Sequence, residues 1–208
     1  MKAYIYTGGR IYPELISESP KQEDLVIAAD SGYDNAIACG VRPNILIGDF
    51  DSICRIPSDI DEVLQLPEEK DLTDTQTAVE IAIERGATEI VIVAGTEGRL
   101  DHTLSTLAII EGLWNRNIRA IITSGQNRVR YIKNSGHILL REKPYKYFSI
   151  IACDDVVKGV SVEGAKYPLK NAKLTRTLQY TVSNEIDGNC SLITVKKGGV
   201  YIIESKDM

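Results

Sequence analysis

Two aspartates stand at the end of an apolar run in the first quarter of the sequence. The run at 45–47 is followed by Gly48 and Asp49 and, two residues later, by Asp51. This pattern predicts a buried strand that ends at the surface. In an extended chain both carboxylates point to the same side, and they repel each other unless a proton or a cation relieves the repulsion. Hard oxygen ligands of this kind suit Mg²⁺, which shares its coordination shell with substrate phosphates.

Other charged residues follow other predicted strands. The apolar run 25–29 ends in Asp30, and the run 89–94 opens onto a turn that leads to Arg99 and Asp101. Alternating strands and helices predict an α/β unit with a mostly parallel sheet, and such sheets bind ligands outside the carboxyl ends of their strands. We therefore expect one edge of the sheet to gather Asp30, Asp49, Asp51, Arg99 and Asp101.

Two further acids precede a predicted helix. Residues 78, 79, 82 and 83 are apolar and recur at helical spacing, and Gly86 ends the pattern. Asp71 and Asp74 lie just before this helix and within its first turn. Acids in these positions also cap helices and oppose the helix dipole, so a purely structural role is the alternative. Their predicted position allows them to join a site that binds phosphate and metal.

The pattern of predicted elements changes near residue 127, from alternating strands and helices to short strands. Before it, we predict strands at 3–6, 25–29, 45–47, 89–94 and 120–122, and helices at 32–39, before Gly86 and at 103–116. After it come short strands at 129–132, 137–140, 147–152, 177–182, 191–195 and 200–204, with a Gly-Gly hairpin turn between the last two. This pattern predicts an α/β domain at 1–125 and an all-β sandwich or small barrel at 126–208.

Composition excludes several classes of protein. The 208 residues are 43% hydrophobic and 25% charged, with a net charge of −5 and no basic run, so we do not expect a nucleic-acid partner. No apolar run approaches the ~20 residues that span a bilayer. The start of the chain lacks a signal-peptide pattern, and the four cysteines are scattered without a Cys-x-x-Cys motif. We expect a cytoplasmic protein with reduced thiols and no membrane association. An edge-rich β-domain often shields its edges by pairing, which favours a homodimer.

Several motifs occur together in a specific order. They are Ala28-Ala29-Asp30-Ser31-Gly32, Ile47-Gly48-Asp49-Phe50-Asp51-Ser52, Lys70-Asp71-Leu72-Thr73-Asp74-Thr75, Gly98-Arg99-Leu100-Asp101-His102, Gly164-Ala165-Lys166-Tyr167-Pro168-Leu169 and Ser183-Asn184-Glu185. In their order and spacing, over nearly the whole length, the chain resembles bacterial thiamine pyrophosphokinase.

The resemblance implies an enzyme that uses ATP and Mg²⁺ to move a pyrophosphoryl group onto the hydroxyethyl oxygen of thiamine, giving thiamine diphosphate and AMP. It also implies a three-layer α/β domain that binds ATP, a C-terminal β-sandwich that binds thiamine, and a homodimer. By this likeness the residues that hold the metal are Asp49, Asp51 and Asp74, which are catalytic together with Arg99 and Asp101. Those near ATP and its phosphates are Asp30, Gly48, Lys70, Asp71, Thr75 and Arg99. Those near thiamine are Asp101, His102, Ser183 and Asn184.

The sequence departs from the family in one respect. Relatives in animals stack the thiamine ring on a C-terminal tryptophan, whereas the single tryptophan here, Trp114, falls in a predicted helix of the first domain. An aromatic partner for thiamine would therefore have to come from Tyr167 or Tyr180. The group that removes the proton from thiamine stays open among Asp101, Asp74 and the metal alone.

Two other functions compete with this one. A metal-dependent glycosyl- or nucleotidyltransferase also uses an Asp-x-Asp pair, and predicts a nucleotide-sugar substrate and no role for Ser183-Asn184-Glu185. A non-catalytic sensor of thiamine or nucleotide predicts binding without turnover. Each predicted acid is present in the sequence, which favours the enzyme.

Overall fold

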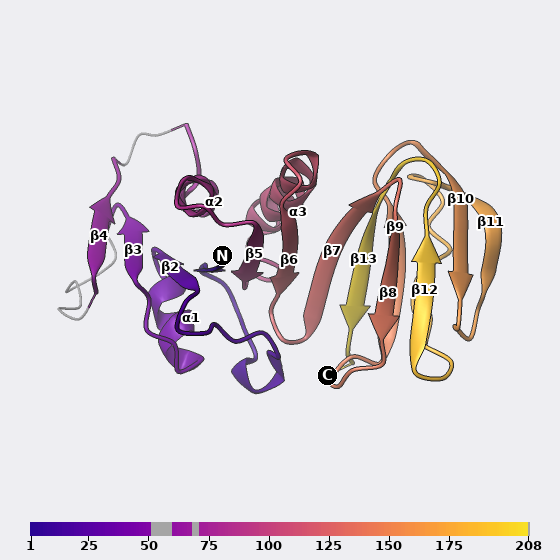
Figure 1. The fold of residues 1–208 in the computed structure, drawn as a ribbon, viewed down its shortest axis with the longest axis horizontal. Helices are drawn as coiled ribbons and strands as arrows, with labels where there is room; N and C mark the ends of the chain where they lie inside the picture. Colours follow the sequence, from indigo (N-terminus) through magenta and orange to yellow (C-terminus); the bar gives the residue numbers. More distant parts are fainter. Residues whose placement is uncertain (51–59, 68–70, 208) are drawn as a thin grey trace. The chain divides into compact units, whose positions relative to one another are not determined.

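The computed structural model describes residues 1–50, 60–67 and 71–207. The chain divides into two compact units, Met1–Gly125 and Gln126–Met208. The first combines helices with parallel strands, and the second is built from antiparallel strands (Figure 1). The prediction of a mixed α/β fold with a mostly parallel sheet and an antiparallel part is confirmed.

The first unit has a parallel sheet at its centre. In chain order its elements are β1 (Lys2–Tyr6), η1 (Pro13–Leu15), β2 (Leu25–Ala29), α1 (Gly32–Ala38), β3 (Ile45–Gly48), β4 (Glu62–Gln65), α2 (Asp74–Glu84), β5 (Glu89–Val93), α3 (Leu100–Asn115) and β6 (Arg119–Thr123). The strands follow the order β4-β3-β2-β1-β5-β6, and each of these neighbouring pairs is parallel. Sequence reasoning missed β4, because this four-residue strand carries polar residues at both ends.

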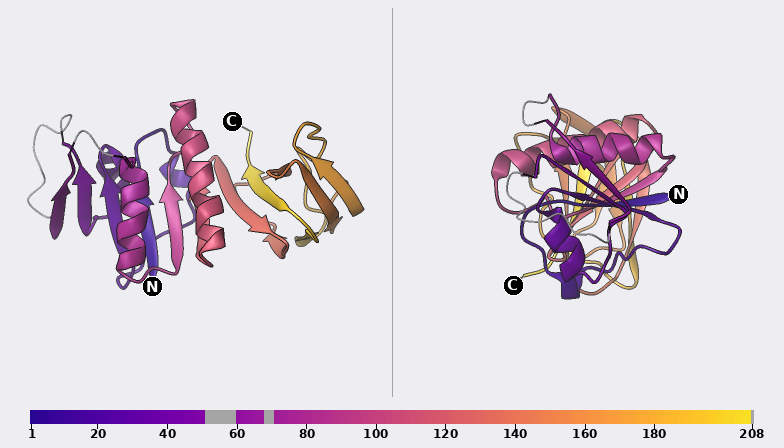
Figure 2. Two further views of the ribbon diagram at one scale, coloured as in Figure 1. Left: turned by 90° about the horizontal axis from the view of Figure 1, so that it is seen from above. Right: turned by 90° about the vertical axis from the view of Figure 1, so that its left-hand side faces the viewer.

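Helices cover both faces of this sheet. Figure 2 shows α2 and α3 on one face and α1 on the other. On the α1 face, Tyr4 and Tyr6 of β1 pack with Ala36 of the helix, while Ile5, which alternates with them, is fully buried. Strands buried on both faces read as continuous apolar runs, which is why these strands are visible in the sequence. None of the helices in the described part of the chain is long and apolar enough to cross a membrane.

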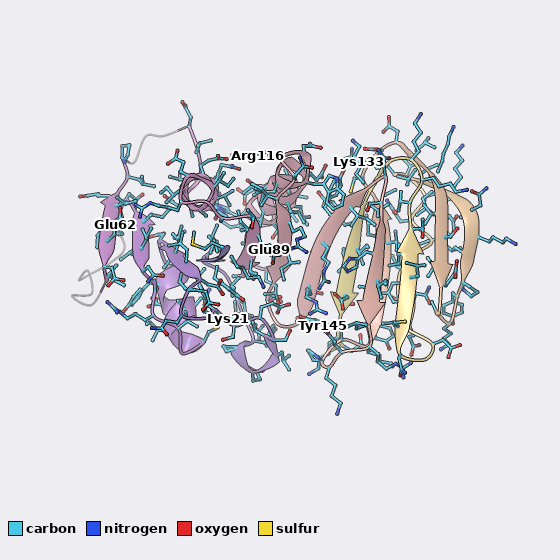
Figure 3. The ribbon with its side chains drawn as sticks, in the orientation of Figure 1. Lys21, Glu62, Glu89, Arg116, Lys133 and Tyr145 are labelled. Carbon is cyan, nitrogen blue, oxygen red and sulfur yellow. The ribbon has the colours of Figure 1, made fainter. Side chains whose placement is uncertain are left out.

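Polar contacts at the sheet edge and between helices involve α2. Glu62 of β4 pairs with Arg85 at the end of α2, with 2.8 Å between Oε2 and Nη2, and Arg116 after α3 pairs with Glu80 of α2 at 2.9 Å. Glu62 and Arg116 are labelled in Figure 3. Both pairs are partly exposed, and such pairs add little stability. They connect α2, whose first residue is Asp74, to β4 and to the end of α3.

The second unit consists of antiparallel strands. They are β7 (Asn127–Lys133), β8 (Gly136–Leu140), β9 (Tyr147–Ala152), β10 (Val156–Glu163), β11 (Leu169–Thr175), β12 (Cys190–Thr194) and β13 (Gly199–Ser205). Strand β13 pairs with β7 and β9, and a separate sheet has the order β11-β10-β12-β8. Buried side chains come from both groups of strands, including Phe148 and Ile150 of β9 and Val160 and Val162 of β10.

Three predictions about the second unit were wrong. Strands β10 and β11 were missed, and residues 177–182 form no regular strand. That segment touches β9 only through isolated bonds, such as Ile150 N–H to Thr181 O at 2.8 Å, and Ser183 then adopts a φ of 57° that ends any extended conformation. The predicted hairpin at 195–200 is wrong because β12 and β13 pair with different strands, so the Gly198-Gly199 turn passes the chain between two sheets.

Candidate functional site

The carboxyl ends of the parallel strands open onto a cavity of about 430 Å³. Its floor comes from the residues that directly follow β1, β2 and β5, and its wall from the first turns of α2 and α3. The lining residues are Thr7, Gly8, Gly9, Ala29, Asp30, Ser31, Thr73, Asp74, Thr75, Gly95, Glu97, Gly98, Arg99, His102 and Thr106. Cavities of this size at this edge are the usual ligand sites of open α/β sheets.

A glycine turn after β1 forms one side of the cavity. The side-chain amide of Asn35 donates hydrogen bonds to Thr7 O at 2.7 Å and to Gly9 O at 2.9 Å. A Cβ placed on Gly8 would lie 2.5 Å from the Ser31 Oγ, and Gly9 has a φ of 111°. The backbone conformation therefore favours glycine at Gly9, while a side chain at Gly8 would have to displace the Ser31 hydroxyl. The backbone of this turn is open to close approach by an anion such as a phosphate.

Three of the predicted acids lie at this edge within the described residues. Asp30 follows β2 with a φ of 52°, and its backbone N–H donates to Ile47 O of β3 at 2.7 Å. Strand β3 ends at Gly48, and a Cβ placed on Gly48 would lie 3.4 Å from the Asp30 Cα. Asp49, the next residue, therefore follows β3 at a point close to Asp30. Asp74 reaches the cavity from the start of α2, where the Thr73 side chain accepts a hydrogen bond from Gln76 N at 3.2 Å. The strained backbone at Asp30 is typical of functional sites.

The predicted metal ligands are only partly described. Asp51 and Lys70 lie outside the described residues. Across 1–50, 60–67 and 71–207, no three His, Cys, Asp or Glu side chains gather in a geometry that could hold a metal ion. Asp74 lines the cavity, while Asp49 is half-buried at the end of β3. The Asp71 side chain is exposed and is not among the lining residues, although Thr75 is.

Arg99 and Asp101 form an ion pair at the start of α3. The Arg99 Nε and Nη2 lie 3.2 and 2.6 Å from the two Asp101 carboxylate oxygens, and the side chains are 75% and 63% exposed. The hydrogen bond from Arg99 lowers the pKa of Asp101 to about 2, with a smaller contribution from the His102 backbone N–H. Arg99 and His102 line the cavity, whereas Asp101 lies outside the lining set in contact with Arg99. Since α3 begins three residues earlier than predicted, Arg99 is its N-cap residue.

Sequence reasoning missed Glu97. This residue lies in the turn between β5 and α3 and lines the cavity. Its Oε1 atom is buried and has no hydrogen-bond partner among the described residues. The rule that selected Asp30 and Asp49, a charged residue just after a parallel strand, also applies to Glu97.

A smaller cavity of about 80 Å³ lies in the second unit. Its lining residues are Phe148, Ile150, Val162, Tyr167, Leu169, Tyr180, Thr181, Val182 and Asn184. Of the four residues predicted to lie near thiamine, it includes Asn184, and it also includes both candidate aromatic residues. Ser183 is exposed and does not line this cavity. Its backbone N–H donates a hydrogen bond to Ser149 Oγ at 3.0 Å and so is already used within the protein.

Comparisons with known proteins agree with one another. The family model described as thiamin pyrophosphokinase, catalytic domain, matches residues 16–122, and that of the vitamin B1 binding domain matches 136–200. A curated thiamine pyrophosphokinase from Bacillus subtilis (strain 168) is 27% identical over 210 aligned residues, with 98% of each chain covered. The crystal structure of thiamine pyrophosphokinase from Bacillus subtilis has a TM-score of 0.89 at 25% identity and covers 100% of both chains. That of the Geobacillus thermodenitrificans protein has a TM-score of 0.83 at 26% identity and covers 100% of this chain and 98% of that chain.

Proposed function

The chain belongs to the thiamin pyrophosphokinase family, and from this premise we propose that it transfers the pyrophosphoryl group of ATP to thiamine. The hydroxyethyl oxygen of thiamine forms a bond to the β-phosphorus of ATP and gives up its proton. The bond from the β-phosphorus to the oxygen that bridges to the α-phosphate breaks, and AMP leaves. The observation that carries this proposal is the cavity at the carboxyl edge of the sheet, lined by a glycine turn, Asp30, Asp74 and Arg99.

The triphosphate needs cationic and N–H partners in this cavity. The glycine turn lets a phosphate approach the backbone of Gly8 and Gly9 closely. Arg99 offers a planar guanidinium that matches the geometry of phosphate oxygens. The pair with Asp101 engages the Nε and Nη2 groups of Arg99, so the Nη1 group of this exposed guanidinium can contact a phosphate while the pair persists. Thr75 and the half-buried Asp49 lie at the same edge and complete the proposed phosphate site, with Lys70 and Asp71 assigned to it by the family resemblance alone.

The acids at this edge fit Mg²⁺. Carboxylate oxygens are hard donors that Mg²⁺ prefers, and Asp74 lines the cavity while Asp49 stands beside Asp30. We assign Mg²⁺ to Asp49 and Asp74, with Asp51 as the third ligand from the sequence motif. Bound there, the ion would offset the phosphate charge on ATP and on the departing AMP.

The lowered pKa of Asp101 limits its role. A carboxyl group with a pKa of about 2 is ionised at neutral pH and is a weak base. We therefore assign Asp101 to orienting the thiamine hydroxyl or attracting its cationic thiazolium ring. His102 lines the cavity from the next position and is a further candidate contact for thiamine.

The second unit is proposed to supply the thiamine-binding surface. We take its antiparallel sheets to form a β-sandwich, with the first unit as the ATP-binding domain. The small cavity beside Tyr167, Tyr180 and Asn184 favours an aromatic contact with thiamine. Ser183, next to it and exposed, can donate its hydroxyl to a ligand.

A cytoplasmic homodimer stays a prediction. Strand β8 is at the edge of its sheet, and Ile138 and Leu140 on it are 59% and 56% exposed. An exposed apolar edge strand is normally covered by a partner or protected, which supports pairing of two chains. Neither nucleic acid nor a membrane enters the proposed reaction.

Product analysis tests the proposed reaction. The purified protein is mixed with ATP, Mg²⁺ and thiamine, and we expect AMP and thiamine diphosphate in equal amounts, abolished by EDTA. ADP and thiamine monophosphate would mean that a single phosphoryl group is transferred. Thiamine binding without turnover would favour the sensor, and turnover of a nucleotide sugar would favour the other transferase class.

A further inference from the structure

The turn between β5 and α3 contains two buried polar atoms that lack partners. The Thr96 Oγ1 and the Glu97 Oε1 are both buried without a hydrogen-bond partner among the described residues. A buried carboxylate oxygen without a donor costs free energy. Glu97 lines the 430 Å³ cavity, so a bound ligand is able to supply the donor that the protein does not.

The backbone holds Glu97 beside the glycine turn. Ala94, just before this turn, has a φ of 80°, a conformation that alanine rarely adopts, and its N–H donates to Thr123 O at 2.8 Å. A Cβ placed on Gly9 would lie 3.0 Å from the carbonyl oxygen of Glu97. The turn that carries Glu97 is therefore in contact with the glycine turn at Gly8 and Gly9. The ends of β1 and β5 set the position of Glu97.

The chemistry of a carboxylate restricts what it can contact. An ionised carboxylate only accepts hydrogen bonds, and a triphosphate offers no donor at neutral pH and would be repelled. The donors nearest to the phosphates of a nucleotide are the hydroxyl groups of its ribose, which is attached directly to the α-phosphate. Other nucleotide-binding α/β proteins place an acid on a ribose hydroxyl.

We infer that Glu97 accepts a hydrogen bond from a ribose hydroxyl of the nucleotide and makes the site selective for ribonucleotides over deoxyribonucleotides. This inference rests on the proposed function, because it takes the cavity to be the nucleotide site. It adds a specificity-determining residue that acts on the donor substrate and leaves the thiamine side unchanged.

Nucleotide binding measured by calorimetry tests the inference without turnover. The probes are Mg²⁺ complexes of ATP, 2′-deoxy-ATP and 3′-deoxy-ATP, in the absence of thiamine. The wild-type protein should bind ATP roughly 10-fold or more tightly than at least one of the deoxy analogues, as expected for a hydrogen bond to a charged group. In Glu97→Ala this preference should fall to nearly 1, mainly through weaker binding of ATP.

Two further variants complete the experiment. Glu97→Gln keeps the shape and one acceptor oxygen, and should retain part of the preference; it also carries the test if Glu97→Ala fails to fold. Glu84→Ala removes an exposed acid from the last turn of α2 and should leave the preference unchanged.

Three results would overturn the inference. The first is equal affinity of the wild-type protein for ATP and both deoxy analogues. The second is an equal loss of affinity for all three nucleotides in Glu97→Ala. The third is a changed preference of Glu97→Ala for ATP over inosine triphosphate, which would place Glu97 near the base. Ribose selectivity in binding without formation of thiamine diphosphate would instead reject the proposed function and keep the inference. Formation of thiamine diphosphate without ribose selectivity would keep the proposed function and reject the inference about Glu97.

Discussion

The side-chain amide of Asn184 makes two hydrogen bonds to the backbone of Tyr167. Its Oδ1 accepts from Tyr167 N–H at 3.0 Å, and its Nδ2 donates to Tyr167 O at 2.9 Å. The same Oδ1 also accepts from Glu185 N–H at 2.9 Å. Asn184 is buried, whereas Tyr167 is 59% exposed. The amide that we predicted to contact thiamine is therefore engaged with the backbone of an exposed aromatic residue, and we propose that Asn184 acts by positioning Tyr167.

Replacing Asn184 should affect both stability and thiamine binding. Asn184→Ala leaves two backbone groups of Tyr167 without partners, so we expect a loss of about 1–3 kcal/mol in the free energy of unfolding. Because Tyr167 is no longer held, the KM for thiamine should rise while that for ATP stays unchanged. Denaturant unfolding and steady-state kinetics measure the two effects, and Asn189→Ala in an exposed turn is the control. An unchanged thiamine KM in a destabilised Asn184→Ala would show that its role is structural only.

Tyr167 itself should contribute through its ring. In Tyr167→Leu we expect the KM for thiamine to rise roughly 2- to 10-fold, which corresponds to the usual strength of ring stacking and cation–π contacts. Tyr167→Phe retains the ring and should behave like the wild type. The matched variant Tyr180→Leu distinguishes the two tyrosines that line the same small cavity. If only that variant raises the KM, Tyr180 is the aromatic partner.

Asp74 should act on turnover more than on binding of thiamine. Asp74→Asn keeps the size of the side chain but removes the charge that we assign to Mg²⁺ and phosphate. We expect kcat to fall at least ~100-fold, because charge stabilisation in the transition state is lost, with little change in thiamine affinity. Glu84→Gln, at the other end of α2, is the control. Near-normal kcat in Asp74→Asn would remove this residue from the site.

The ion pair at the start of α3 can be tested by titration. Since the hydrogen bond from Arg99 lowers the pKa of Asp101 to about 2, Arg99→Ala should return that pKa toward the ordinary value of roughly 3.9. The folded-state pKa lies below the unfolded one, so the pair stabilises the fold above pH ~4 and ceases to do so as the pH falls toward ~2. NMR titration of the Asp101 carboxyl group measures the shift, with Arg116→Ala as the control. A pKa that is the same with and without Arg99 would contradict the assigned cause.

A buried ion pair lies in the second unit, and removing either partner should lower the free energy of unfolding. Glu204 of β13 is 3% exposed, and its oxygens lie 2.7 and 2.8 Å from Nη2 and Nε of Arg128, with Arg130 as a further partner. Figure 3 labels Tyr145, over whose ring the Arg128 guanidinium lies at 4.7 Å. We expect Glu204→Gln to cost about 3–5 kcal/mol of unfolding free energy, because it removes the buried negative charge that Arg128 and Arg130 share. The partly exposed Glu142 then remains as a carboxylate partner of Arg128, at 2.8 Å.

The pH dependence of this pair follows from its pKa. Burial raises the pKa of Glu204, but the hydrogen bond from Arg128 and the charges of Arg130 and Arg128 together lower it below its ordinary value. The pair therefore stabilises the fold above that ordinary value, roughly 4.3, and the contribution is lost as the pH falls below it. Chemical unfolding at pH 7 and near pH 3 measures the difference. Glu163→Gln, an exposed acid on β10, should show no such cost at either pH.

Much of the first unit was visible in the sequence because its signals are local. The strand predicted at 25–29 has the same bounds as β2, and the runs at 45–47 and 89–94 differ from β3 and β5 by one residue. Apart from Glu89 at the start of β5, these runs carry no charged residue, because helices cover both faces of the sheet. In the second unit, β10 and β11 were missed, since half-exposed strands mix polar and apolar residues and such a pattern is weak.

By itself, the sequence determined the alternation of elements in the first unit, the acids that follow β2 and β3, and the resemblance to a family, because hydrophobic runs, caps and motifs are properties of short segments. Only the tertiary structure decided which of these residues share a cavity. It placed Glu97 in the lining and left Asp71 exposed, and it engaged the amide of Asn184 with Tyr167 seventeen positions away. The physical reason is that the direction of a side chain depends on elements packed against it from distant parts of the chain.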